Sequence, residues 1–247
     1  MENEKPQAED KLQEKKPQEA NDRMKTWDHD TPSMREIVPG LFLGNVRASI
    51  KRLLLQENGI NSMVSLSNAR WGSWGTTTRN AGIPAHRHKY VQCVDSSTQD
   101  LLVYMSDICD FIDEMASPSL RSPSVLPVGY EHELHSKAHD GPSEALLVHC
   151  DMGISRSPTV IIAYLMRKYG VTLDDALKFV QSKQKVKPSA NFIRQLQVWE
   201  QVGYQIWEDV EKMVPKTPYQ AFLADRAALL KKKGLTGNEP LAPLTLG

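Results

Sequence analysis

The chain has 247 residues, with 30 Lys and Arg against 30 Asp and Glu, so its formal net charge is zero. A hydrophobic content of 40% excludes a wholly disordered protein, and the neutral charge argues against a dedicated nucleic-acid binder. Three cysteines are too few for a disulfide framework, and no apolar run is long enough for a membrane span or a secretory signal. We therefore expect a monomer of the cytoplasm, with the nucleus as a second location and no membrane association.

The composition divides the chain into a folded domain between two tails. Residues 1–30 are rich in charged side chains and poor in apolar ones, and we expect a disordered charged tail there. Residues 31–214 are expected to form one domain, in which the Pro- and Ser-rich stretch 117–144 is an inserted surface loop. Residues 215–247 are expected to be a C-terminal tail, with room for a short helix at 218–233.

Apolar periodicity predicts strands and helices that alternate along the domain. An apolar run around Pro39 and Gly40 predicts two short strands joined by a turn over residues 37–44. Further strands are predicted at 62–66, 89–94 and 145–148, and helices at 46–57, 101–115, 158–169, 173–184 and 190–207. Residues 67–82 are rich in turn-forming residues and are expected to be irregular. This order of elements indicates a mixed sheet covered by helices.

One stretch carries an identifiable chemistry: His149-Cys150-Asp151-Met152-Gly153-Ile154-Ser155-Arg156-Ser157-Pro158. A buried strand is predicted to end at His149 and a helix to begin near Pro158, since proline is tolerated in the first helical turn. The N–H groups of the loop and of the helix N-terminus then converge and form an anion-binding cradle. Cys150 lies at its rim, where the positive helix end and the Arg156 guanidinium favour the nucleophilic thiolate.

The other residue types in this loop suit a phosphate group. Arg156 presents a planar fork that binds two phosphate oxygens together, which a lysine cannot do. Gly153 allows the backbone to curl tightly around a ligand. The alternative is a buried structural cysteine in an ordinary turn, but it leaves the combination of His149, Cys150, Gly153 and Arg156 to chance.

The motif His149-Cys150-x-x-Gly153-x-Ser155-Arg156-Ser157 resembles the phosphate-binding loop of the cysteine-dependent protein phosphatases, in the dual-specificity form and of the small atypical type. Residues 37–45 and 59–61 resemble the opening segment and first helix-to-strand turn of that family, and residues 188–196 its final-helix entry. The resemblance covers about residues 36–207. It implies a protein tyrosine phosphatase-like α/β fold, with a central mixed, mostly parallel sheet flanked by helices. The implied activity is hydrolysis of phosphotyrosine and phosphoserine or phosphothreonine in proteins through a phosphocysteine intermediate, without metal or other cofactor.

The catalytic roles of the family can be carried over to matching positions of this sequence. Cys150 would be the nucleophile, Arg156 the phosphate clamp, and Ser157 the hydroxyl that assists departure of the thiolate in the second step. The family places a general acid on a loop upstream of the cysteine. Asp95 matches that position, and Asp100 is the alternative.

The remaining residues of the motif are expected to hold the phosphate or the loop. His149 is interpreted as a supporting residue rather than a base. Backbone N–H groups would bind the phosphoryl oxygens, and they belong to Asp151, Met152, Gly153, Ile154, Ser155 and Arg156. Because Asp151 adds a negative charge where related lipid phosphatases carry lysines, a phosphoprotein is favoured over a highly anionic substrate.

Three questions about function and regulation are left open by the sequence. The enzyme could act on a non-protein phosphate such as an RNA 5′ end or a phosphocarbohydrate. The domain could instead be a catalytically silent phosphopeptide-binding module, although both Cys150 and Arg156 are present. A regulatory disulfide between Cys93 and Cys150 is the third open question.

Overall fold

The computed structural model describes residues 31–68, 74–115, 120, 126 and 144–237. The predicted tail at 1–30 and almost all of the predicted insertion at 117–144 lie outside the described residues. Leu120 and Leu126 within the insertion are described, and both are buried in the main hydrophobic core. These two positions of the insertion therefore contribute to the core of the domain.

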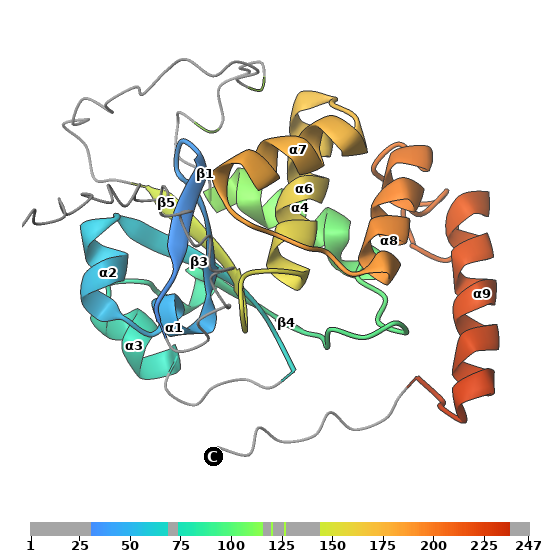
Figure 1. Ribbon diagram of the computed structural model, residues 1–247, viewed down its shortest axis with the longest axis horizontal. Coiled ribbons are helices and arrows are strands. Elements are labelled where there is room, and N and C mark those ends of the chain that lie inside the picture. The colour runs from blue at the N-terminus through green and yellow to red at the C-terminus, as the bar shows by residue number, and fades with distance from the viewer. Residues whose placement is uncertain (1–30, 69–73, 116–119, 121–125, 127–143, 238–247) are drawn as a thin grey trace, which may run out of the picture.

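A five-stranded sheet lies at the centre of the fold, in the order β1-β2-β5-β3-β4 (Figure 1). Its strands are β1 (Met34–Val38), β2 (Leu41–Asn45), β3 (Ile60–Ser67), β4 (His88–Gln92) and β5 (Ala145–Cys150). β1 and β2 are antiparallel around the predicted turn, where Gly40 has a φ of 81°. The pairs β2–β5, β5–β3 and β3–β4 are parallel, which confirms the mixed, mostly parallel sheet.

Helices cover both faces of this sheet (Figure 1). One face carries α1 (Val46–Ser49), α2 (Arg52–Glu57) and α3 (Trp74–Asn80). The other carries α4 (Leu102–Met115), α6 (Arg156–Tyr169), α7 (Leu173–Lys183) and α8 (Ala190–Gln201), and α9 (Thr217–Lys233) lies outside α8. A 3-10 turn, η1 (Ala85–Arg87), leads into β4. Within the described part of the chain, no helix combines the length and the apolar character that crossing a membrane requires.

Apart from shifts of a few residues at the ends of elements, three predictions differ from the structure. The helix expected at 46–57 is divided into α1 and α2, because the backbone is extended at Lys51 (ψ 92°). Residues 74–80 were expected to be irregular but form α3, which contacts α2 and η1. The helix expected at 190–207 ends at Gln201, and Gly203 and Tyr204 then take left-handed conformations with φ of 62° and 64°.

Strand β5 is buried along its whole length, and its side chains alternate between two cores. Leu146, Val148 and Cys150 belong to the larger core, which includes residues of α4, α6 and α8. Ala145 and Leu147 belong to a smaller core that also contains residues of α2 and β3. The alternation therefore directs Cys150 to the same face of the sheet as α6.

Two interactions fix the helices that follow the loop. Thr172 caps α7, since its Oγ1 accepts a hydrogen bond from the backbone N–H of Asp175 at 3.2 Å. Trp199 of α8 is fully buried, and its Nε1 donates to the carbonyl oxygen of Ala163 in α6 at 3.1 Å. α6 and α8 are thus joined by a polar contact as well as by apolar packing.

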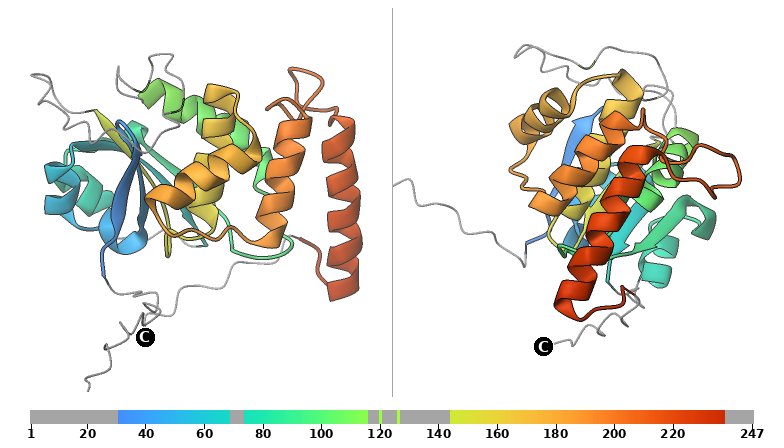
Figure 2. Two further views of the ribbon diagram at one scale, coloured as in Figure 1. Left: turned by 45° about the horizontal axis from the view of Figure 1, so that its top comes forward. Right: turned by 90° about the vertical axis from the view of Figure 1, so that its right-hand side faces the viewer.

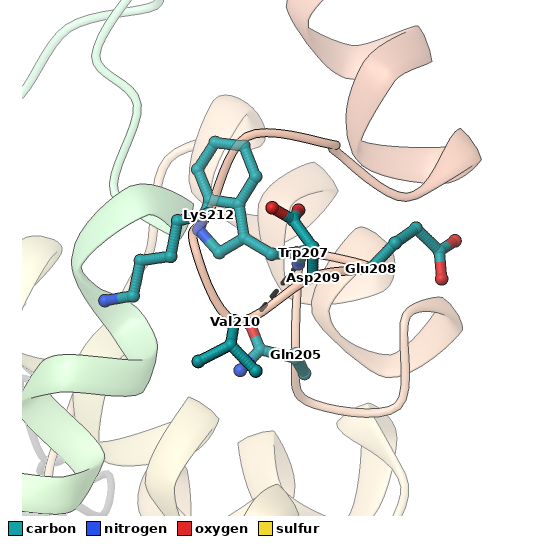
Figure 3. A pocket seen from close by; sticks show the side chains of 6 residues that line it. All are labelled: Gln205, Trp207, Glu208, Asp209, Val210 and Lys212. Carbon is teal, nitrogen blue, oxygen red and sulfur yellow. Dashed lines mark hydrogen bonds between the residues drawn. The ribbon is translucent and has the colours of Figure 1, made fainter.

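A pocket of about 330 Å³ lies in the connection between α8 and α9 (Figure 3). Its lining consists of Gln205, Trp207, Glu208, Asp209, Val210 and Lys212. None of these residues belongs to the cysteine motif, so this pocket and the motif are different places in the fold.

Candidate active site

The cysteine motif forms the connection between β5 and α6. Cys150 is the last residue of β5, and α6 begins at Arg156. Gly153 has a φ of 71°, and a Cβ at this position would lie 2.7 Å from the carbonyl oxygen of Gly44 in β2. Only glycine allows the loop to pass so close to that strand. Because β2, β3, β4 and β5 are parallel, their carboxyl ends meet at the edge of the sheet that carries this loop.

Three carbonyl groups of the loop are hydrogen-bonded to donors outside it. Their distances are 3.2 Å from Val46 N to Asp151 O, 3.4 Å from Gln184 Nε2 to Gly153 O and 2.8 Å from Lys187 N to Ile154 O. With these carbonyl oxygens turned outward, the loop can direct N–H groups towards its centre, as an anion-binding concavity requires.

Two donors from the motif contact the sulfur of Cys150, which is only 2% exposed. The backbone N–H of Gly153 and the Oγ of Ser157 each donate to Cys150 Sγ at 3.2 Å. Hydrogen bonds donated to a sulfur stabilise negative charge on it. The structure therefore brings Cys150, Gly153 and Ser157 together in an arrangement that suits a thiolate.

Arg156 is buried and connects three segments of the chain. Its Nη1 donates to the carbonyl oxygen of Leu66 in β3 at 3.4 Å and to that of Cys93, just after β4, at 3.1 Å. Burial acts to lower the pKa of Arg156, but negative charge on Cys150 and Asp151 outweighs this effect and raises the pKa, so the guanidinium keeps its charge. Its Nε is buried without a hydrogen-bond partner among the described residues, which leaves this donor for an oxyanion.

The carboxylate of Asp151 takes part in the site through its side chain as well as its backbone. Its Oδ2 lies 2.7 Å from Arg156 Nη2, and its Oδ1 accepts a hydrogen bond from Ser67 Oγ at 3.0 Å. From the sequence, Asp151 was expected to supply a backbone N–H and a charge that disfavours highly anionic substrates, but its contacts with Arg156 and Ser67 were not predicted. The carboxylate partly neutralises Arg156, so an incoming phosphate has to compete with it.

His149 lies beneath the loop in a chain of hydrogen bonds. Burial lowers its pKa to about 3, so the imidazole is neutral. Its Nε2 is 2.6 Å from Ser65 Oγ, and the same oxygen is 2.8 Å from Nε2 of His88. This placement suits a supporting residue. Ser65 was not identified from the sequence, although a polar side chain within the apolar strand predicted at 62–66 was a signal that could have been used.

The two candidate general acids occupy different environments. Asp95 is exposed and lies two residues after Cys93, whose carbonyl oxygen is bound by Arg156. Asp100 is 8% exposed, and its Oδ1 accepts hydrogen bonds from two backbone N–H groups at the start of α4. Its Oδ2 accepts from Tyr219 Oη at 2.8 Å, and burial raises its pKa. Asp100 is therefore engaged as a helix cap, whereas the carboxylate of Asp95 is accessible to a ligand.

Cys93 and Cys150 are both free in the structure. Burial raises the pKa of Cys93 to about 12, which keeps it a neutral thiol despite the opposing effect of Arg156. Among residues 31–68, 74–115 and 144–237, no group of three or more His, Cys, Asp or Glu side chains is placed to hold a metal ion.

Comparison with protein families and curated proteins gives a consistent result. The family described as dual specificity phosphatase, catalytic domain, matches residues 136–202. Dual specificity protein phosphatase 1 of Arabidopsis thaliana is 33% identical over 171 residues, which cover 69% of this chain and 69% of the relative. Human dual specificity protein phosphatase 26 is 30% identical over 161 residues, which cover 65% of this chain and 64% of the relative.

Solved structures of similar fold agree with these relatives. The crystal structure of human DUSP28 superposes with a TM-score of 0.52 at 26% identity, over 70% of this chain and 95% of that chain. A mouse putative dual specificity phosphatase, crystallised with zinc tungstate, superposes with a TM-score of 0.52 at 30% identity, over 72% of this chain and 93% of that chain.

Proposed function

The chain belongs to the dual-specificity phosphatase family and is a phosphoric monoester hydrolase, and from this premise we propose that it dephosphorylates phosphoproteins with Cys150 as nucleophile. The observation that carries the proposal is the environment of Cys150 Sγ. Two donors hold the sulfur at 3.2 Å, and the neighbouring Arg156 has a buried Nε with no partner among the described residues. This arrangement supplies a nucleophile and a free donor to a phosphoryl group.

In the first step the thiolate of Cys150 attacks phosphorus, and the bond from phosphorus to the ester oxygen breaks. Asp95 gives its proton to the departing oxygen, since expulsion of an unprotonated alkoxide or phenoxide is slow. Arg156 and the loop N–H groups stabilise the charge on the three remaining phosphoryl oxygens. The products of this step are the dephosphorylated substrate and phosphocysteine.

In the second step water attacks the phosphocysteine. The Asp95 carboxylate accepts a proton from this water, the bond between sulfur and phosphorus breaks, and inorganic phosphate leaves. The hydroxyl of Ser157, 3.2 Å from Sγ, donates a hydrogen bond to the thiolate that forms. The cycle returns every group to its starting protonation state.

Replacement of the nucleophile tests the central assignment. Cys150→Ser is expected to abolish hydrolysis of p-nitrophenyl phosphate while the protein still binds tungstate as a phosphate analogue. Cys109→Ala is the matched control, because Cys109 is a buried thiol of α4 with no hydrogen bond to the loop, and it should retain turnover. Substantial hydrolysis by Cys150→Ser, or no labelled phosphate on Cys150 after rapid quenching, would refute the mechanism.

The acid assignment is tested with Asp95→Asn and Asp100→Asn. Asp95→Asn is expected to lower kcat/KM for phenyl phosphate by about 10²–10⁴ and to remove the alkaline limb of its pH profile. Asp100→Asn should retain most of the activity, since Asp100 caps α4. The reverse result would transfer the acid role to Asp100.

The substrate class is tested with a hydrolysis panel of phosphotyrosine peptide, phosphothreonine peptide, triphosphorylated RNA and inositol phosphates. The carboxylate of Asp151 at the loop supports phosphopeptides over the more highly charged substrates. Fastest turnover of RNA or inositol phosphates would contradict this proposal. We also propose a cytoplasmic and nuclear location, which the three free cysteines support and cell fractionation would test.

A further inference from the structure

Helix α9 lies beyond the segment that matches the phosphatase family, which ends at residue 202, yet it is packed onto the domain. Figure 2 shows it beside α8 in both views. Tyr219, Phe222 and Leu230 are each no more than 6% exposed, and Arg194 of α8 forms an ion pair with Asp225 of α9. The segment predicted as a C-terminal tail therefore contains a helix that belongs to the folded body.

This helix contacts the segment that carries the candidate general acid. We define the acid loop as residues 95–101, between β4 and α4. Three side chains of α9 donate hydrogen bonds to it. The distances are 2.8 Å from Tyr219 Oη to Asp100 Oδ2, 2.7 Å from Arg226 Nε to Thr98 O and 2.8 Å from Lys233 Nζ to Ser97 Oγ.

The acid loop is also held from α8. Asn191 Nδ2 donates to the carbonyl oxygens of Ser96 and Gln99 at 3.0 and 2.8 Å. Gln195 Nε2 donates to the same Gln99 carbonyl at 2.8 Å, and Gln195 Oε1 accepts from the backbone N–H of Leu101 at 2.6 Å. The loop therefore has two sets of anchors, one in α8 within the family match and one in α9 outside it.

The backbone is held on both sides of Asp95. On one side, Arg156 binds the carbonyl oxygen of Cys93, and on the other Asn191 binds that of Ser96. The carboxylate itself is exposed, so its position relative to the sulfur depends on how firmly the backbone on either side is held. Proton transfer to a leaving oxygen is sensitive to such positioning, since small displacements of a catalytic group lower the rate strongly.

We propose that α9 is a positioning element for general-acid catalysis, and that Arg226 fixes the acid loop so that Asp95 reaches the leaving oxygen. The inference rests on the acid role proposed for Asp95. Arg226 acts through the backbone of Thr98 and touches neither the substrate nor the sulfur. Its half-buried side chain and its contact with a main-chain carbonyl make it better suited to this role than Lys233, which is exposed and bound to a hydroxyl.

The test uses the full chain with Arg226→Met, which keeps an unbranched side chain but removes the donor. The matched control is Lys232→Met, at an exposed position of the same helix. For each variant, kcat/KM is measured with phenyl phosphate, whose leaving group needs protonation, and with p-nitrophenyl phosphate, whose leaving group needs it much less. The inhibition constant for tungstate reports the phosphate site, and thermal unfolding reports the fold.

Arg226→Met is expected to lower kcat/KM for phenyl phosphate about 10-fold and for p-nitrophenyl phosphate less than about 2-fold, with tungstate inhibition unchanged. Lys232→Met should behave as the wild type on both substrates. An equal loss on both substrates would show a general structural role and overturn the inference.

The Asp95→Asn variant distinguishes the inference about α9 from the proposal that Asp95 is the general acid. If it selectively slows phenyl phosphate but Arg226→Met does not, the inference about α9 fails while the acid assignment stands. If Asp95→Asn has no selective effect, the acid assignment fails, and the inference fails with it.

Discussion

Gly153→Ala perturbs the loop at a position where the backbone and a neighbouring strand both restrict the side chain. The φ of 71° at Gly153 is in the left-handed region, which costs an L-residue about 1–2 kcal/mol. A Cβ would also lie 2.7 Å from the oxygen and 2.9 Å from the carbon of the Gly44 carbonyl, whereas ordinary contacts begin at 3.4 Å. Because both atoms belong to the backbone of β2, no side-chain rotation relieves the overlap. Overpacking of this kind costs about 1–3 kcal/mol, so the expected loss in unfolding free energy is about 2–5 kcal/mol.

The same overlap moves the loop relative to the sulfur. The backbone N–H of Gly153 donates to Cys150 Sγ, and its displacement also shifts the neighbouring donors for the phosphoryl oxygens. We expect kcat/KM for p-nitrophenyl phosphate to fall by about 10².

Gly170→Ala is the matched control, measured by urea unfolding and by the same activity assay. Gly170 ends α6 with a φ of 63°, but a Cβ there would meet nothing within 4 Å. The Gly170→Ala variant should lose only about 1–2 kcal/mol of unfolding free energy, which is the conformational cost of the left-handed backbone, and it should retain full activity. The reasoning about the loop is wrong if Gly153→Ala loses no more stability than Gly170→Ala and keeps the wild-type kcat/KM.

Three further predictions follow from the hydrogen bonds of the site. Ser65→Ala removes the partner of the buried neutral imidazole of His149 and should lower the unfolding free energy by about 1–3 kcal/mol in urea, whereas an unchanged midpoint would contradict the hydrogen-bond chain. Asp151→Asn removes the carboxylate that competes for Arg156, so the inhibition constants for phosphate and tungstate should fall severalfold; constants that rise would contradict this competition. Burial raises the pKa of Asp100, so its protonated form favours the folded state. The stability of the wild type relative to Asp100→Asn should therefore be greatest below the ordinary carboxyl pKa of 3.8 and decline as pH rises from there through the raised pKa of the folded state, and a pH-independent difference would contradict the burial argument.

The sequence was sufficient to predict those parts of the site whose structure depends on residues that are neighbours in the chain. The apolar run before Cys150 predicted β5, Gly153 predicted the tight loop, and Pro158 predicted the start of a helix within two residues of Arg156. Each of these signals depends on the residue itself or on its immediate neighbours. The sheet class followed as well, because the order of strands and helices restricts the pairing of strands.

The contacts that organise the site depend on tertiary packing and were not predicted. Ser67 lies 84 residues before Asp151 in the chain, and Tyr219 lies 119 residues after Asp100. The periodic pattern of apolar residues that predicts helices and strands does not indicate contacts between residues so far apart in the chain. For the same reason the sequence left Asp95 and Asp100 as alternatives, and only the capping role of Asp100 separates them.

Arg156 has an architectural task that is independent of chemistry. Through Nη1 it joins the carboxyl ends of β3 and β4 to the start of α6, in addition to the backbone pairing that already holds β3, β4 and β5 together. A descendant that lost its sulfur nucleophile would still gain from keeping this arginine. Retention of the guanidinium in a related sequence is therefore not by itself a sign of catalysis, because these two carbonyl contacts would favour it even where the sulfur has been lost.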